Sequence, residues 1–250
     1  MHRFYVSPDD WDSRSVALRG SEAHHARDVL RMKNGEKLVL FNGKGREITA
    51  EIASLAQDEI RLRKLHEAET PPLGCRIVLG QAIPKGKNME LIVQKAVEIG
   101  AAEIAPIVSD RTIVQLDSEN AAQKQIKWQQ TAIEAAKQCG QNWLPRVHAP
   151  RKLAEFFSTT SAQSFDLRLI GSLQPDAQHL KKILETYCSE HGDRARSVLM
   201  LVGPEGDFTP AELALARRYG CQPITLGPII LRVETAAIYC LSILSYELLI

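Results

Sequence analysis

The segment Ser197-Val-Leu-Met-Leu-Val-Gly-Pro-Glu-Gly-Asp-Phe-Thr-Pro-Ala-Glu212 runs from an apolar strand through a glycine-rich turn into a helix. Thr209, Pro210 and Glu212 are the residue types favoured at the N-cap, N1 and N3 positions, so we expect the helix to begin at Pro210. The turn matches neither the dinucleotide-binding pattern G-x-G-x-x-G nor the P-loop pattern G-x-x-x-x-G-K-[ST]. From the local pattern alone, a ligand-binding turn and an ordinary strand-to-helix connection both remain open.

Strands and helices alternate on both sides of this segment. Strand-like apolar runs stand at 75–80, 104–108, 166–170, 197–202 and 223–226, and helical patterns at 87–99, 118–138, 175–190, 210–219 and 234–249. This alternation predicts an open α/β sheet that is largely parallel. Ligands bind such sheets at the carboxyl ends of the strands, which is where the turn at 203–206 would lie.

The first seventy residues follow a different pattern. Short strand-like runs at 3–6, 15–19, 37–41, 48–52 and 60–65 are accompanied by the turn dipeptides Asn34-Gly35 and Asn42-Gly43. Short strands at this close spacing predict a small β-barrel. Pro71-Pro72 interrupts the pattern as a linker would, so we expect one domain at residues 1–72 and an α/β domain at residues 73–250.

Composition excludes several classes of protein. The 250 residues carry 31 Lys and Arg against 30 Asp and Glu, so a strongly basic nucleic-acid coat is excluded and any nucleic acid must bind a local patch. Neither the five cysteines nor the seven histidines show metal-ligand spacing, so we expect no metal. The N-terminus has no apolar stretch of a signal peptide, and the longest apolar run, 235–246, is far shorter than a membrane span of about 20 residues. We therefore expect a cytoplasmic protein that does not enter membranes.

A second segment of interest is Leu226-Gly-Pro-Ile-Ile-Leu-Arg-Val-Glu-Thr-Ala236. Gly227-Pro228 turns the chain, and the apolar residues that follow could line a pocket. Arg232 stands at the expected start of the last helix, where a cation opposes the helix dipole unless a partner compensates it. A surface pair between Arg232 and Glu234, which would contribute little, is the alternative interpretation.

Together these two segments resemble the RsmE family, the 16S ribosomal RNA (uracil-N3)-methyltransferases of the SPOUT class. The resemblance extends over the whole chain. The runs Arg3-Phe-Tyr-Val and Val29-Leu-Arg-Met32 resemble the family's N-terminal PUA-like RNA-binding barrel. Gln94-Lys-Ala-Val-Glu-Ile-Gly100, and Gln138-Cys-Gly140 with Pro145, resemble two further family motifs. One short motif would be a weak signal, but five in the right order and spacing are a strong one.

The resemblance implies a SPOUT-type α/β sheet with a deep trefoil knot, a homodimer, and S-adenosylmethionine as the methyl donor. It implies that the donor lies among three loops at the strand ends. The residues it assigns to them are Leu169, Ile170 and Gly171 in the first loop, Leu201, Val202, Gly203 and Gly206 in the second, and Leu226, Gly227, Ile229, Ile230 and Leu231 in the third. Backbone groups there could read the adenine edge, and the three apolar side chains at 229–231 could sandwich its ring.

The target that the resemblance implies is N3 of one uridine in the decoding region of 16S rRNA in the small ribosomal subunit. Since N3 must lose its proton before it can attack a methyl group, the site needs a base and a group that stabilises the resulting anion. We expect Arg232 to stabilise the anion and Glu205 or Glu234 to orient Arg232 or to accept the proton. The residues expected to bind RNA are Arg3, Arg27, Arg31, Lys33, Lys85, Lys87 and Trp143.

The sequence departs from the family pattern at four positions. Asp207 and Ile229 replace a glycine and an arginine, and Gln141 and Trp143 replace two arginines. Asp tolerates a positive φ better than most residues, so we expect the turn at 207 to survive. Trp143 could stack on an unpaired base or have a structural role. A ribose 2′-O RNA methyltransferase of the same superfamily and a catalytically silent RNA-binding relative remain alternatives.

Overall fold

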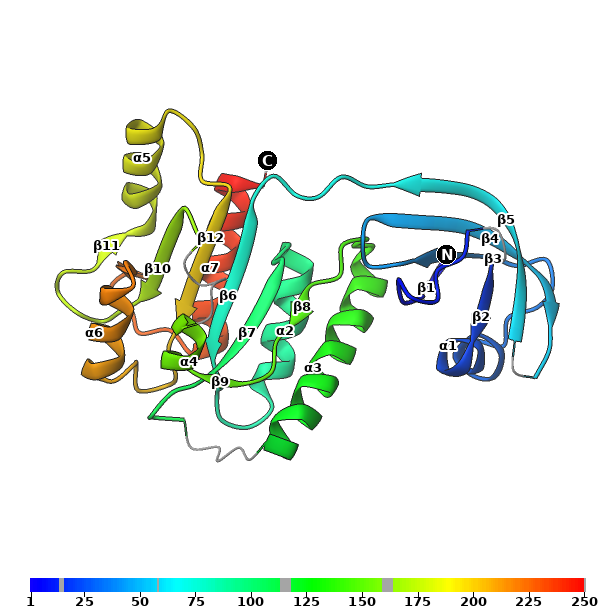
Figure 1. Ribbon diagram of the computed structural model, residues 1–250, viewed down its shortest axis with the longest axis horizontal. Coiled ribbons are helices and arrows are strands. Elements are labelled where there is room, and N and C mark those ends of the chain that lie inside the picture. The colour runs from blue at the N-terminus through cyan, green and yellow to red at the C-terminus, as the bar shows by residue number, and fades with distance from the viewer. Residues whose placement is uncertain (14–15, 58, 113–117, 159–163, 250) are drawn as a thin grey trace. The chain divides into compact units, whose positions relative to one another are not determined.

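The computed structural model describes residues 1–13, 16–57, 59–112, 118–158 and 164–249 (Figure 1). The chain divides into two compact units. The first consists of Met1–Pro72 with Ile133–Leu144, and the second of Leu73–Ala132 with Pro145–Ile250. The sequence pattern gave no sign that Ile133–Leu144 packs with the first unit, because this segment continues a helix that begins in the second.

The first unit is built on a five-stranded sheet. The strand order is β1 (His2–Tyr5), β3 (Lys37–Phe41), β4 (Arg46–Leu55), β5 (Glu59–Glu69), β2 (Ala17–Arg19). β1 pairs with β3 in parallel and the other pairs are antiparallel. Helix α1 (Gly20–His24) continues into a π-helical turn at His25–Val29. Apolar side chains from alternating strand positions, among them Phe4, Leu38, Ile48 and Ile60, form the core of this unit.

Ion pairs and hydrogen bonds hold Ile133–Leu144 to helix α1 and to the sheet of the first unit. The Lys137 ammonium lies 3.0 Å from a carboxylate oxygen of Glu22, and the side chain of Lys137 is only 10% exposed. The Asn142 amide donates to Glu47 at 3.0 Å and accepts a hydrogen bond from Arg3 at 2.5 Å. These partners are more than 90 residues apart in sequence, so no local pattern could have indicated them.

All strand pairs of the second unit are parallel. Seven strands follow one another in the order β11 (Gln178–His179), β13 (Gln222–Thr225), β10 (Leu167–Gly171), β12 (Ser197–Val202), β6 (Arg76–Ala82), β7 (Glu103–Val108), β8 (Arg146–Val147), and β9 (Arg151–Lys152) also pairs with β7. The α/β sheet predicted from the sequence is therefore confirmed. The very short strands β8, β9 and β11 were not predicted.

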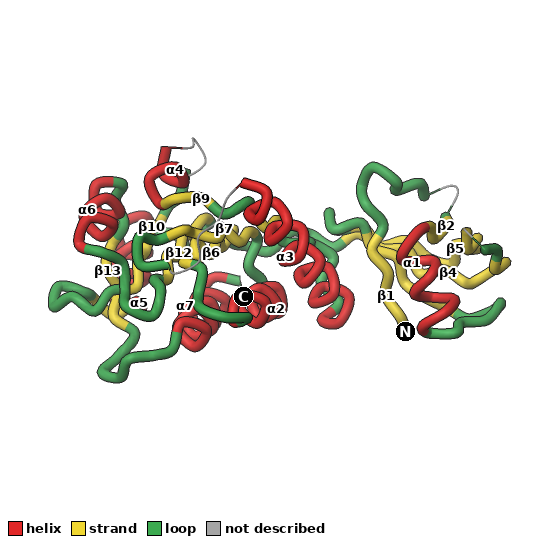
Figure 2. Tube along the Cα trace, turned by 90° about the horizontal axis from the view of Figure 1, so that it is seen from below, coloured by secondary structure: helices red, strands yellow, loops and turns green. Residues whose placement is uncertain are grey.

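Helices cover both faces of this sheet. Figure 2 shows α2 (Asn88–Ile99) and α7 (Val233–Leu248) on one face, and α4 (Leu153–Ser158) and α6 (Pro210–Arg218) on the other. The remaining helices are α3 (Ser118–Cys139) and α5 (Leu180–His191). Val78 and Leu199 of the strands pack with Phe157 of α4 and Leu213 of α6 in one core. α4 is a further element that the sequence pattern did not reveal.

The path of the chain after β13 determines where the site forms. β13 lies beyond β10, yet α7, the next element, packs against α2, β6 and β12. Residues 226–232 therefore run back past the carboxyl ends of β10 and β12. Because all these strands are parallel, the segments after β10, β12 and β13 meet at one edge of the sheet.

A half-buried charge cluster lies at the opposite edge, where β6 and β7 begin. His148 Nε2 lies 2.6 Å from one oxygen of Glu103, and Arg76 lies 2.6 Å from the other. The hydrogen bond from His148, followed by those from Arg76, lowers the pKa of Glu103 from its usual 4.5 to about 2. Because the folded pKa is depressed, the stability that Glu103 contributes is present above pH 4.5 and is lost as the pH falls toward 2.

We predict that Glu103→Gln lowers the free energy of unfolding by about 1–3 kcal/mol at pH 7, since it leaves Arg76 and His148 without their anion. The difference from the parent chain should shrink between pH 4.5 and pH 2, as measured by urea denaturation. Glu98→Gln is the matched control, because Glu98 pairs with Lys95 on the surface of α2. A loss for Glu103→Gln that is equal at pH 7 and pH 3 would contradict this account.

Candidate active site

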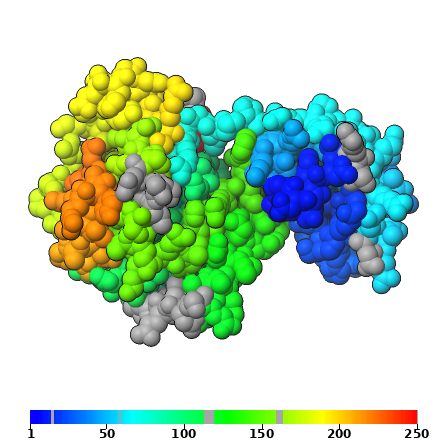
Figure 3. Space-filling model, in the orientation of Figure 1, coloured from blue at the N-terminus to red at the C-terminus, as the bar shows by residue number. Residues whose placement is uncertain are grey.

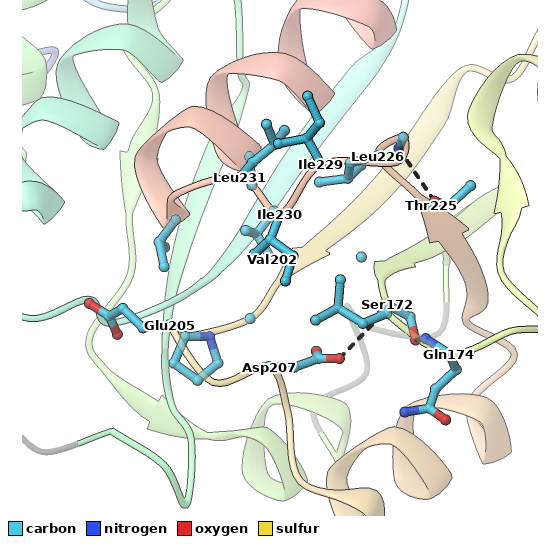
Figure 4. Close-up of a pocket in the computed structure, with 17 residues that line it drawn as sticks. Ser172, Gln174, Val202, Glu205, Asp207, Thr225, Leu226, Ile229, Ile230 and Leu231 are labelled. Atoms are coloured by element: carbon cyan, nitrogen blue, oxygen red, sulfur yellow. Dashed lines mark hydrogen bonds between the residues drawn. The ribbon is translucent and has the colours of Figure 1, made fainter.

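Three segments that follow parallel strands surround one pocket (Figure 4). The first follows β10, the second follows β12, and the third joins β13 to α7. The pocket has a volume of about 200 Å³. Its lining residues are Gly171, Ser172, Leu173, Gln174, Val202, Gly203, Pro204, Glu205, Asp207, Thr225, Leu226, Gly227, Ile229, Ile230, Leu231, Val233 and Ala236. The described part of the chain thus brings together all three loops that the sequence suggested.

Most of the residues expected to bind a donor line this pocket, but four do not. Leu169, Ile170 and Leu201 are fully buried within their strands, behind the pocket wall. Gly206 faces an adjoining hollow on the far side of the turn. The motif indicated the loops that surround this pocket, but it could not show at which residue each strand ends.

Several lining residues were not expected from the sequence. Ser172, Leu173, Gln174, Pro204, Asp207 and Thr225 follow or end the strands, and Val233 and Ala236 lie on the first turn of α7. The sequence could have indicated Val233 and Ala236, because they are three positions apart on a helix and therefore share a face. Ser172 to Gln174 carry no motif, and only the position after a buried strand could have indicated them.

Asp207 links two of the three loops. It has a φ of 63°, which is unusual for a residue with a side chain, and it keeps the turn as expected. One carboxylate oxygen accepts a hydrogen bond from the backbone N–H of Phe208 at 2.7 Å, and the other accepts one from Leu173 at 3.3 Å. The carboxylate therefore connects the turn after β12 to the loop after β10, a contact that a glycine at this position could not make.

The third loop presents apolar side chains to solvent. Ile229 and Ile230 are 74% and 76% exposed, although both line the pocket. Figure 4 shows Ile230 near Val202, with Ser172, Gln174 and Asp207 on the other side of the space. Adjacent exposed isoleucines at the mouth of a pocket are typical of a surface that a ligand covers. A flat, partly apolar ligand with polar edges fits between these walls.

The two expected catalytic carboxylates accept hydrogen bonds from the segment where β6 leads into α2. Glu205 accepts a hydrogen bond from the backbone N–H of Lys85 at 2.9 Å, and Glu234 accepts one from the Asn88 amide at 3.2 Å. Lys85 lies in the loop between β6 and α2, and Asn88 is the first residue of α2, so this junction holds both carboxylates beside the pocket. The sequence did not predict a role for Asn88.

Arg232 occupies the N-cap position of α7, directly after the pocket residue Leu231. Its side chain is exposed. Within the described residues it forms no ion pair with Glu205 or Glu234, so the surface pair considered from the sequence does not form. A free guanidinium at the pocket mouth can bind an anionic group of a ligand.

The basic residues expected to bind RNA differ in how exposed their side chains are and in whether they already have partners within the protein. In the first unit, the Arg3 guanidinium lies over the Phe41 ring and pairs with Glu47, with only 15% of its side chain exposed. Arg27 pairs with Asp28 and donates to the carbonyl oxygen of Gln57. Arg31 and Lys33, and in the second unit Lys85 and Lys87, are exposed.

Trp143 makes structural contacts within the first unit. Its indole N–H donates to the carbonyl oxygen of Thr70 at 2.9 Å. The ring lies so close to Gly45 that a Cβ atom there would approach it to 2.9 Å. The half-buried ring therefore packs against the first unit, and its indole N–H already has an acceptor.

Three of the five cysteines are buried, and the described residues form no metal-binding cluster. Among the described residues, no group of three His, Cys, Asp or Glu side chains could hold a metal ion. Burial raises the pKa of Cys75, Cys221 and Cys240 to about 12, which keeps these thiols protonated. No helix in the described ranges is long and apolar enough to cross a bilayer.

Comparison with known proteins agrees with this geometry. A model of an RNA methyltransferase domain matches residues 71–245, and a model of an RNA methyltransferase PUA domain matches residues 18–65. Ribosomal RNA small subunit methyltransferase E of Bacillus subtilis is 30% identical over 237 residues, which cover 94% of this chain and 91% of that protein.

Two solved structures are similar over nearly their whole length. One is Ribosomal RNA small subunit methyltransferase E from Neisseria gonorrhoeae bound to S-adenosyl methionine, with a TM-score of 0.84, 32% identity, and coverage of 99% of this chain and 98% of that one. The other is Lpg2936 from Legionella pneumophila in complex with the bound cofactor SAM, with a TM-score of 0.85, 32% identity, and coverage of 98% and 97%.

We predict that Asp207→Ala lowers the free energy of unfolding by about 1–3 kcal/mol, because alanine tolerates a positive φ poorly and leaves two backbone N–H groups without their acceptor. Asp207→Asn should lose less, since asparagine accepts the same φ and keeps one oxygen. Chemical denaturation of both variants measures the difference. Equal losses would show that the carboxylate geometry does not matter.

Proposed function

Since the chain belongs to the ribosomal RNA small subunit methyltransferase E (RsmE) family, we propose that it transfers a methyl group from S-adenosylmethionine to N3 of a uridine in 16S rRNA of the small ribosomal subunit. The observation that carries this proposal is the pocket at the strand ends, where three loops meet beside Arg232, Glu205 and Glu234. The location agrees with the rule that ligands of parallel sheets lie at the carboxyl ends of the strands.

The residues of the pocket fit S-adenosylmethionine. Ile229, Ile230 and Val202 offer apolar walls for the adenine ring, and the backbone of residues 226–231 offers donors and acceptors for its edge. When bound, the donor supplies a methyl group on a sulfonium, which is already a good leaving group. The task of the protein is therefore to orient the uracil, remove its N3 proton and stabilise the resulting charge.

Three side chains of the chain are suited to these tasks. Arg232 is exposed and unpaired within the described residues, so its guanidinium can stabilise the uracil anion. Glu205 and Glu234 are the carboxylates that can receive the N3 proton. Their hydrogen bonds to the Lys85 N–H and the Asn88 amide orient them, and both donors are neutral, so neither forms a competing ion pair.

The RNA would also contact exposed cations. Arg31 and Lys33 of the first unit and Lys85 and Lys87 of the second are exposed and can bind phosphates, whereas the internal bonds of Arg3 make it a structural residue. The match of residues 18–65 to an RNA methyltransferase PUA domain supports RNA binding by the first unit. Because the proposed substrate is part of the ribosome, we infer that the protein acts in the cytoplasm.

We further infer a homodimer and a trefoil knot. On the face formed by α2 and α7, Leu91, Tyr239 and Tyr246 are 40%, 45% and 72% exposed. Tyr239 and Tyr246 are seven residues apart and share one side of α7, so they form an apolar stripe that a second copy would cover. The return of residues 226–232 past β10 and β12 supports the threading that a knot requires.

The proposal is tested with small ribosomal subunits from cells that lack this protein. The subunits are incubated with the purified chain and labelled S-adenosylmethionine, and the digested RNA is analysed by nucleoside mass spectrometry. Labelled 3-methyluridine is the expected product. A methylated ribose would support the 2′-O alternative instead. Binding of the donor without any labelled nucleoside would mean that the substrate is another RNA, and no donor binding would favour a catalytically silent relative.

We predict that Arg232→Lys lowers the rate of methyl transfer by about 10- to 100-fold, because lysine lacks the planar fork that can contact both sides of the uracil anion. The affinity for S-adenosylmethionine, measured by calorimetry, should not change. Arg218→Lys, an exposed substitution on α6, is the matched control and should leave the rate unchanged. An unaltered rate in Arg232→Lys would remove Arg232 from the mechanism.

A further inference from the structure

A second hollow lies on the far side of the turn that borders the pocket. Its volume is about 450 Å³, and it is lined by Arg111, Gly206, Phe208, Pro210, Leu213 and Arg217, among others. Leu173, Gln174 and Asp207 line both spaces, so they form a shared wall. The hollow therefore adjoins the proposed donor site without being part of it.

A buried carboxylate fixes the loop that carries Arg111. Glu212 is only 7% exposed. Its two oxygens accept hydrogen bonds from the backbone and hydroxyl of Thr209 at 2.9 and 3.0 Å, from the Ser109 hydroxyl at 3.0 Å and from the Asp110 N–H at 3.0 Å. The loop after β7 is thereby bound to the start of α6. This fixes Arg111 before any ligand arrives, which reduces the entropy cost of binding.

Arg111 is the uncompensated charge of the hollow. Its guanidinium donates to the carbonyl oxygen of Gly206, and within the described residues it forms no ion pair. Arg217, in contrast, lies 2.7 Å from a carboxylate oxygen of Asp176. The carboxylate of Asp207 is occupied by two backbone N–H groups. The hollow thus offers an anion one guanidinium with unused donors.

The floor of the hollow is apolar. Phe208 and Leu213, which are 2% and 8% exposed, belong to the core beneath it. The apolar surface that a ligand can reach is therefore that of Leu173, Pro210 and Ala214, which are all exposed. A cation beside an apolar floor suits a nucleotide, because a base can lie on the apolar surface while its phosphate contacts the arginine. Neither a purely apolar ligand nor a simple anion would use both features.

We propose that this hollow binds a nucleotide of the rRNA substrate that flanks the target uridine. Its base would lie against Leu173, Pro210 and Ala214, and its phosphate would contact Arg111. The target base itself must reach the donor pocket, from which the turn of residues 203–207 separates the hollow. A flanking nucleotide held across this turn would fix the register of the RNA. This inference rests on the proposed function and adds a subsite to it.

The test introduces a negative charge into the hollow. Ala214 lines it from the exposed side of α6, and Ala211, one turn earlier, is equally exposed but does not line it. Helix α6 forms part of the surface drawn in orange in Figure 3. Ala214→Glu and Ala211→Glu therefore make the same change of charge on the same helix, and only the former obstructs the hollow.

We expect Ala214→Glu to weaken binding of a labelled 16S rRNA fragment about tenfold or more, and Ala211→Glu to change it less than twofold. The affinity for S-adenosylmethionine should stay constant in both variants, which also shows that they are folded. Arg111→Ala should weaken RNA binding. It should also reduce the steepness of log affinity against log salt by about one, the value expected for the loss of one phosphate contact. Equal RNA affinities for the two glutamate variants would overturn the proposal.

The same experiment separates this inference from the proposed function. If the parent chain binds the RNA and the donor, and Ala214→Glu behaves like Ala211→Glu, only the flanking-nucleotide subsite is wrong. If the parent chain binds neither, the proposed methyl transfer fails, and the subsite fails with it.

Discussion

The parallel arrangement of β10, β12 and β13 is the constraint on which the rest of the second unit depends. It places three chain segments, far apart in sequence, at one edge of the sheet. The chain then returns along that edge to α7, whose first turn closes the pocket with Val233 and Ala236 and carries Arg232 and Glu234. The pocket and the positions of Arg232 and Glu234 beside it are thus consequences of one path of the chain.

Two carboxylates near the pocket each link two segments of the chain through hydrogen bonds. Asp207 joins the turn after β12 to the loop after β10, and Glu212 joins the start of α6 to the loop after β7. Each accepts hydrogen bonds only from neutral groups, and each charge is distributed over several donors. These hydrogen-bonded links hold the loops in place before a ligand binds, which is what catalysis by positioning requires. Mobile loops would have to be ordered at the expense of affinity.

The sequence predicted features that depend on local chemistry and missed those that depend on distant partners. The capping box at Thr209 and Glu212 and the helix beginning after Arg232 were predicted correctly, because neighbouring residues determine them. That Glu212 also binds Ser109, 103 residues away, could not be inferred from any periodicity.

The partners of Lys137 and Asn142 were also beyond the reach of a local pattern, and they hold the end of α3 in the first unit. Strands of two residues such as β8 are too short to carry a pattern. Only the family resemblance indicated that the loops around the pocket bind a donor, because the glycine-rich turn alone was compatible with an ordinary connection.

The most direct test of this account is a crystal structure of the chain with S-adenosylmethionine. We expect the adenine between the loop of residues 226–231 and the loop after β10, in contact with Ile230, and the sulfonium on the side of Arg232 and Glu205. Donor density at another place, or a bound donor that leaves Ile229 and Ile230 exposed to solvent, would contradict the assignment of the pocket on which the proposed mechanism and the neighbouring RNA subsite both depend.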